Sequence, residues 1–152
     1  MFEHLAVNAR NVVRRATDEA RVRGDRRVGT DHILLALLAD SFGIEVIGVG
    51  LAEARESARS LDLRALEAIG VPSAGLYPHD AVRTAGYLPF SAGARDILRR
   101  TVQLSAAERA RQIGIRHLLA AVLEREDPDP AMAMLAELGV DRKLARERLA
   151  AA

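Results

Sequence analysis

Two histidines occupy matching places in two similar stretches of the chain, and such a pair raises the question of a metal or catalytic site. His32 lies in the stretch 29–35 (Gly-Thr-Asp-His-Ile-Leu-Leu), and His117 lies in the stretch 114–119 (Gly-Ile-Arg-His-Leu-Leu). Neither a His-x-x-x-His spacing nor a carboxylate cluster accompanies either histidine, so a metal site lacks ligands. A nucleophile motif such as Gly-x-Ser-x-Gly is also missing. We interpret both histidines as packed residues that cap their own helical turn, and we expect no enzyme activity, no metal and no cofactor.

The residues directly before the histidines differ in charge. Asp31 precedes the first histidine and Arg116 the second. An acid at the start of a helix is favoured by the helix dipole, and it is also an acceptor for a guanidinium group. An arginine at the same place repels a guanidinium but attracts a carboxylate or a phosphate. The sequence leaves open whether Asp31 has a helix-stabilising or a ligand-binding role.

The two stretches belong to an internal duplication. Residues 9–38 align without a gap to residues 94–123, 85 positions later, and ten of the thirty pairs are identical. A repeat of this kind indicates a duplicated supersecondary unit. We predict a single domain over 1–152, with repeat one at 1–86 and repeat two at 87–152. The first repeat is expected to carry 16 extra residues between Ala39 and Ala65.

Apolar residues recur at helical spacing along the chain, and no segment alternates as a strand does. We therefore predict an all-α fold of about eight helices, a four-helix repeat duplicated about a pseudo-twofold axis. The stretches after Gly29 and Gly114 are apolar nearly all round, so both helices should be buried. The expected helices cover 2–24, 30–39 with Thr30 as N-cap, 51–69, 78–84, 92–112 after Ser91, 115–125, 130–138, and 142–150 after Asp141, with a loop at 41–50 and an extended segment at 87–91.

Composition limits the kinds of partner. The 22 basic and 21 acidic residues nearly balance, cysteine is absent, and no apolar run approaches the length of a membrane span. We expect a cytoplasmic protein that binds no membrane. Arginine runs on the first long helix and on its counterpart suggest an alternative, a DNA-binding regulator. Acidic residues interrupt both runs, so a solvated, salt-bridged surface is the favoured interpretation.

The order of motifs resembles one family. It comprises Met-Phe-Glu at 1–3, Gly-Thr-Asp-His-Ile-Leu-Leu at 29–35, Leu-Pro-Phe-Ser-x-x-Ala-Arg at 88–95, the second copy at 113–123 and Leu-Gly-Val-Asp at 138–141. This pattern resembles the N-terminal domain of Clp-type AAA+ unfoldases, most closely the ClpC branch, over nearly the whole chain. The resemblance implies a non-catalytic domain that docks substrates and adaptor proteins for the Clp protease system.

The same resemblance implies particular ligand contacts. In ClpC-type domains the acid of the Gly-Thr-Glu-His element contacts the guanidinium of phosphoarginine; here that position is Asp31 in repeat one and Arg116 in repeat two, where the charge is opposite. Phe2 and Phe90 match the aromatics around an apolar groove that binds macrocyclic peptides, and Arg95 matches a basic position beside it. The two phenylalanines are equally suited to closing the ends of the core.

Three departures from the family pattern change these expectations. Leu5 replaces a usual aromatic and Ala6 a usual threonine, so the first pocket should be more apolar and less able to hold an anion. The chain also lacks the Gly-x-x-x-x-Gly-Lys-[Ser/Thr] phosphate loop of an ATPase. We expect a free-standing adaptor or decoy of the Clp system, or the docking part of a larger unfoldase.

Overall fold

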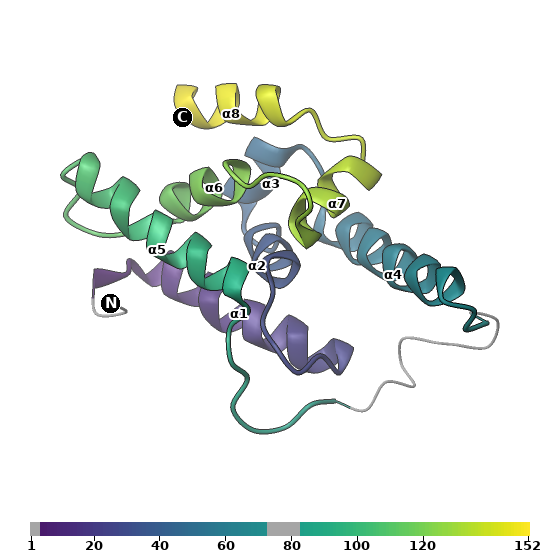
Figure 1. The fold of residues 1–152 in the computed structure, drawn as a ribbon. Helices are drawn as coiled ribbons and strands as arrows, with labels where there is room; N and C mark the ends of the chain where they lie inside the picture. The colour runs from purple at the N-terminus through teal and green to yellow at the C-terminus, as the bar shows by residue number, and fades with distance from the viewer. Residues whose placement is uncertain (1–3, 73–82) are drawn as a thin grey trace.

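The computed structural model describes residues 4–72 and 83–152, and this part of the chain is helical without a strand (Figure 1). The all-α prediction is confirmed. Two isolated parallel bridges are the only extended pairings among the described residues. The helices are α1 (Val7–Arg23), α2 (Thr30–Leu37), α3 (Ser41–Ile47), α4 (Leu51–Ala68), α5 (Ala92–Ala107), α6 (Ile115–Leu123), α7 (Pro130–Glu137) and α8 (Arg142–Ala151).

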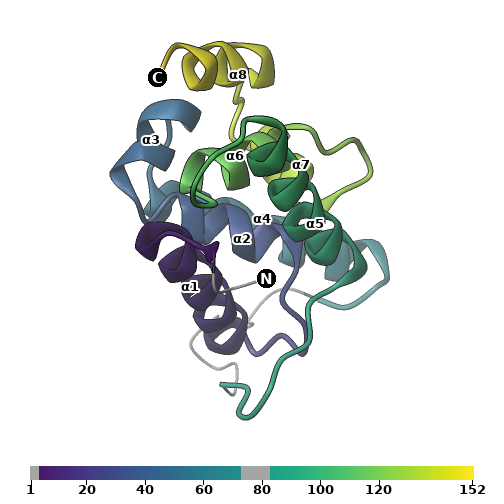
Figure 2. The ribbon, with the colours of Figure 1, turned by 90° about the vertical axis from the view of Figure 1, so that its left-hand side faces the viewer.

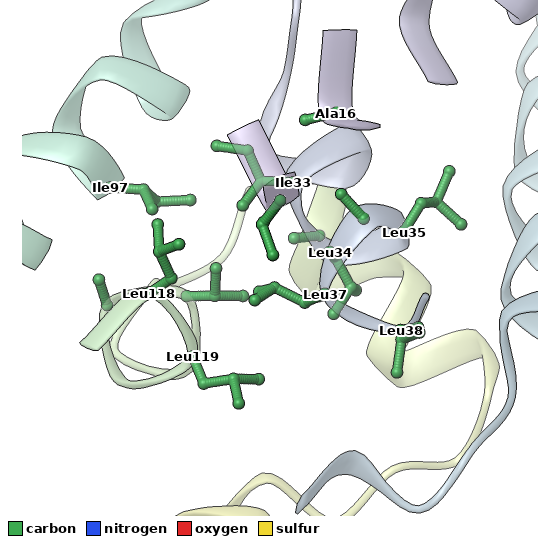
Figure 3. Close-up of a cluster of buried hydrophobic side chains, with 14 of the residues drawn as sticks. Ala16, Ile33, Leu34, Leu35, Leu37, Leu38, Ile97, Leu118 and Leu119 are labelled. Atoms are coloured by element: carbon green, nitrogen blue, oxygen red, sulfur yellow. The ribbon is translucent and has the colours of Figure 1, made fainter. Parts of the chain in front are cut away.

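Helices α2 and α6 form the centre, with α1 and α8 on opposite sides of them (Figures 1 and 2). Every residue from His32 to Leu38 is buried. In the core, leucines of α2 face Leu118 and Leu119 of α6, and Ile97 of α5 closes the cluster (Figure 3). The prediction of two helices buried nearly all round is therefore confirmed, and this apolar contact joins the two repeats.

The two bridges repeat the same hydrogen bonds 85 positions apart. The Ala6 amide donates to the carbonyl of Ile113 at 3.0 Å, and the Ser91 amide donates to the carbonyl of Val28 at 2.8 Å. The return bonds, Ile113 to His4 and Val28 to Pro89, are both 2.9 Å long. We call the segment between α1 and α2, and that between α5 and α6, the connector of its repeat. The first segment of each repeat therefore pairs with the connector of the other repeat, which confirms the duplication inferred from the sequence.

Several element boundaries differ from the prediction. Helix α1 begins at Val7, because Leu5 is held extended against Ile113. Helix α5 ends at Ala107, where Arg109 takes a left-handed φ of 52°. The predicted helix at 78–84 falls mostly outside the described residues, and Arg83 and Thr84 at its end are not helical.

Two local predictions are wrong for identifiable reasons. The segment 41–50, predicted as a loop from its three glycines, contains α3, capped by Asp40 through the Phe42 amide. Thr30 is not the N-cap of α2. That place belongs to Gly29, and the Thr30 hydroxyl instead donates to Asp129 at 2.8 Å.

Part of the extra length of repeat one lies in α4. Helix α3 packs against α8 and α4 packs against α7, as a twofold relation of α3 to α7 and of α4 to α8 requires. Helix α4 has 18 residues and α8 has 10. The longer α4 lies largely within the predicted range 39–65, and the position of the remaining extra residues stays a prediction. The repeat boundary at residue 86 stays a prediction.

Candidate functional site

The Val28–Phe90 bridge gathers part of the predicted site. Phe90 is half-buried against the core, and Ser91 directly after it caps α5 by accepting the Ala94 amide at 3.1 Å. Arg95 is exposed on the first turn of α5. Asp31 lies three residues beyond Val28, so Asp31 of repeat one and Phe90 and Arg95 of repeat two follow the two segments that this bridge joins.

Arg116 lies apart from this bridge. Arg116 is exposed in the first turn of α6, next to the Leu5–Ile113 bridge. Phe2 lies outside the described residues. Asp31 and Arg116 occupy equivalent positions in the two repeats, and the structure therefore places them beside two separate connectors.

Asp31 is held by an arginine of its own chain. Arg23 at the end of α1 donates to Asp31 at 2.8 Å and to Asp62 of α4 at 2.7 Å, and its Nε lies 3.5 Å from Asp25. Burial opposes the charge on Arg23, but the carboxylate of Asp31, followed by those of Asp62 and Asp25, raises the pKa of its guanidinium above the ordinary value. This ionic network ties three elements together, and it already supplies Asp31 with a guanidinium.

Both histidines cap the turns that contain them. The Gly29 amide donates to Nδ1 of His32 at 2.8 Å, and the Gly114 amide donates to Nδ1 of His117 at 2.9 Å. Because Nδ1 accepts, the proton lies on Nε2, which faces Asp25 at 2.7 Å in repeat one and Glu108 at 3.0 Å in repeat two. The interpretation of packed, capping histidines is confirmed.

Asp25 links this network to pH. Burial tends to raise the pKa of Asp25, but the hydrogen bond from His32 and the charge of Arg23 outweigh burial and lower it. A lowered pKa stabilises the fold above the unfolded-state value and loses that contribution as the pH falls through the folded-state value. We expect the free energy of unfolding of Asp25→Asn to fall less steeply with decreasing pH below about pH 4 than that of the unchanged chain. Urea unfolding at stepped pH measures this dependence.

Glu126→Gln is the matched control, because Glu126 is exposed and has no ion pair in the described part of the chain. It should leave the acid limb of the stability profile unchanged. Equal flattening by both variants would contradict the role given to Asp25.

The sequence reasoning undervalued Tyr87 and Asp129. Tyr87 is 85% exposed and lies three residues before Phe90 on the same extended segment, and its signal was the Tyr-Leu-Pro-Phe run among so few aromatics. Asp129 is buried and bonds Thr30 across the repeats. The only sign of Asp129 in the sequence was its position directly before Pro130, where a helix cap is expected.

A hollow of about 370 Å³ lies between α5 and α6. The charged residues that line it form ion pairs with one another, since Arg100 bonds Glu124 and Arg99 bonds Asp96 at 2.8 Å. We assign no ligand to it. The described residues hold no group of three or more His, Asp or Glu placed to bind a metal ion, and none of their helices is long and apolar enough to cross a membrane.

The chain is similar in sequence to bacterial and chloroplast proteins, although no model of a known protein family matches it. It is 31% identical over 149 residues to an uncharacterized protein of Mycobacterium tuberculosis, a match covering 97% of this chain and 53% of that protein. It is 29% identical over 146 residues to the chloroplastic chaperone protein ClpC1 of rice, Oryza sativa, covering 93% of this chain and 14% of that protein. The chain thus spans about half the length of the mycobacterial relative.

The fold matches solved Clp N-terminal domains. The N-terminal domain of the chaperone ClpD from Arabidopsis thaliana superposes with a TM-score of 0.75 at 21% identity, covering 99% of this chain and 98% of that one. The Hsp104 N-terminal domain from Candida albicans gives 0.63 at 14% identity, covering 95% and 88%. The chain has the fold of a Clp N-terminal domain. Its sequence similarity to Clp protease subunits and chaperones confirms the resemblance inferred from the motifs.

Proposed function

We propose that this chain is a non-catalytic docking domain of the Clp system that binds substrate proteins, adaptors or peptide-like ligands. The observation that carries the proposal is the exposed aromatic segment at the Val28–Phe90 bridge, on a fold shared with Clp N-terminal domains. Tyr87 is exposed, Phe90 is half-buried, and Arg95 has no ion pair in the described part of the chain. Tyrosine and arginine are enriched among the residues that dominate protein interfaces.

The proposed contact surface consists of Tyr87, Phe90 and Arg95. Phe2, outside the described residues, is proposed as a separate aromatic contact. The rigid base of the surface is supplied by the bridge to Val28 and by the Ser91 cap of α5. A surface whose backbone is already hydrogen-bonded loses little conformational entropy when a ligand binds. An apolar or macrocyclic peptide is the ligand class that suits it best.

Phosphoarginine is a less suitable ligand for repeat one. Its guanidinium would have to displace Arg23 from Asp31, and Arg23 donates to that carboxylate at 2.8 Å. At the corresponding place in repeat two, Arg116 repels a guanidinium. We therefore propose that Asp31 has a structural role and that Arg116 contacts acidic groups instead.

The test is calorimetric titration of the purified chain with a ClpC-binding macrocyclic peptide, with phosphoarginine and with a short DNA duplex. Binding of the macrocyclic peptide at micromolar concentration is expected. Phe90→Ala should weaken it at least about tenfold, since truncating a central aromatic contact costs about 1–2 kcal/mol or more.

Phe42→Ala is the matched control, because Phe42 on α3 is also half-buried against the core and lies outside the proposed surface. It should leave the dissociation constant unchanged. Binding of the DNA duplex alone would favour the regulator alternative, and equal weakening by both alanine variants would remove the proposed surface.

A further inference from the structure

Four arginines around the Leu5–Ile113 bridge have no counter-ion among residues 4–72 and 83–152. Arg109, Arg111 and Arg116 are exposed on the connector and the first turn of α6. Arg10 on α1 contacts only the carbonyl of Leu5, at 3.4 Å. None of the four has a carboxylate within ion-pair distance in the part of the chain that the structure describes.

In repeat one the position equivalent to Arg116 is acidic and forms an ion pair, although Arg26 and Arg27 on the same connector are exposed and have none among the described residues. The residue 85 positions before Arg116 is Asp31, and Arg23 bonds both Asp31 and Asp62. In repeat two the one nearby acid on the connector, Glu108, bonds His117 at 3.0 Å. The two connectors and the first turns after them therefore differ in charge at two equivalent positions, where repeat two has Arg109 and Arg116 and repeat one has Gly24 and Asp31.

The backbone at Arg109 is a second, independent observation. Arg109 has a left-handed φ of 52°, whereas the residue 85 positions earlier is Gly24, with a φ of 76°. Glycine adopts this conformation without cost, and an arginine does not. The cationic side chain of Arg109 therefore lies at a turn whose equivalent in repeat one, at Gly24, has no side chain.

We propose that Arg10, Arg109, Arg111 and Arg116 form a recognition surface for an acidic peptide segment of a partner protein. The inference rests on the proposed docking function and assigns it a second surface with a defined partner chemistry. Guanidinium groups bind carboxylates through paired hydrogen bonds. A run of glutamate or aspartate side chains would supply the missing counter-ions.

The charge pattern favours a peptide over nucleic acid. The whole chain carries a formal net charge of only +1, so it lacks the broad positive field that attracts a duplex. Arg109 and Arg111 lie on the connector, and Arg10 and Arg116 lie on two different helices beside it, so the four do not form a stripe along one helix. Duplex binding at this surface is therefore an outcome that would overturn the proposal.

The experiment is fluorescence anisotropy of a labelled glutamate-rich peptide with the full chain, at low and at physiological salt. A peptide with glutamine at the same positions tests the need for charge. We expect binding of the acidic peptide, weakening with salt, and no binding of the glutamine peptide. The double variant Arg111→Gln, Arg116→Gln should weaken binding about tenfold.

The matched control is Arg26→Gln with Arg27→Gln. It removes the same charge from the connector of repeat one, where both arginines are exposed, and it should change the dissociation constant by less than about twofold. All these substitutions are on the surface, and circular dichroism melts verify that each variant is folded. Equal weakening by the two double variants, binding of the glutamine peptide, or displacement of the acidic peptide by duplex DNA would overturn the inference.

The test separates this inference from the proposed function. If the macrocyclic peptide binds in a Phe90-dependent way while the acidic peptide does not bind, the second surface is excluded and the docking function stands. If the acidic peptide binds through Arg111 and Arg116 while the macrocyclic peptide does not bind, the arginine surface is supported and the aromatic surface is excluded.

Discussion

Replacing Asp129 with alanine is expected to lower the free energy of unfolding by about 3 kcal/mol. Asp129 caps α7 by accepting the amides of Ala131 and Met132, at 2.9 and 3.4 Å. Its carboxylate also accepts the Thr30 hydroxyl at 2.8 Å and Nε of Arg125 at 3.0 Å, and its side chain is only 2% exposed. The substitution removes a helix cap and leaves the buried Thr30 hydroxyl and Nε of Arg125 without their acceptor, so the costs of both losses add.

Asp141→Ala separates the cap from the buried network. Asp141 caps α8 by accepting the amides of Lys143 and Leu144, at 3.0 and 3.1 Å, but it is exposed and bonds no other element in the part of the chain that the structure describes. Its loss should cost about 1 kcal/mol. Urea unfolding of both variants checks the difference, and equal losses would show that the link from Asp129 to Thr30 contributes nothing.

The second large effect is expected at Gly43. A Cβ atom built on Gly43 would lie 2.0 Å from the carbonyl oxygen of Leu37 and 2.7 Å from its carbon. These are backbone atoms, so α3 would have to move away from the end of α2. We expect Gly43→Ala to lower the free energy of unfolding by about 2 kcal/mol, because crowding outweighs the helix propensity that alanine gains.

Gly50→Ala is the control for this glycine. Gly50 precedes α4, and the nearest atom to an added Cβ is 3.9 Å away. The control should lose less than about 1 kcal/mol, as measured by thermal or urea unfolding. A Gly43→Ala variant as stable as the Gly50 variant would mean that α3 adjusts without cost.

Much of the fold was predictable because its signals are local or repeated. The apolar stretches of α2 and α6, the Ser91 and Asp141 caps and the glycine after α4 all follow from residue type and spacing. The failures came where a residue serves a distant contact. Gly43 indicated a loop because the close approach to Leu37 is not visible in the sequence, and Thr30 indicated a cap because its partner Asp129 is 99 positions away.

The candidate site was less predictable for the same reason. The sequence singled out Asp31 by its place in a motif, but it gave no sign that Arg23 would hold that carboxylate. It placed Phe90 on an extended segment correctly, and the pairing with Val28 came only with the fold. Residue type marks the groups that have binding chemistry, whereas tertiary contacts decide which of those groups remain available.

The crossed pairing of the first segments has a consequence for the history of the chain. A single repeat alone would leave both its first segment and its connector unpaired. Two identical copies would satisfy both by exchanging segments, as a domain-swapped homodimer does. The bonds from Ala6 to Ile113 and from Ser91 to Val28 are the two halves of such an exchange. The present molecule is in this sense equivalent to a fused dimer, and because its two halves differ in sequence, equivalent positions carry opposite charges at Asp31 and Arg116.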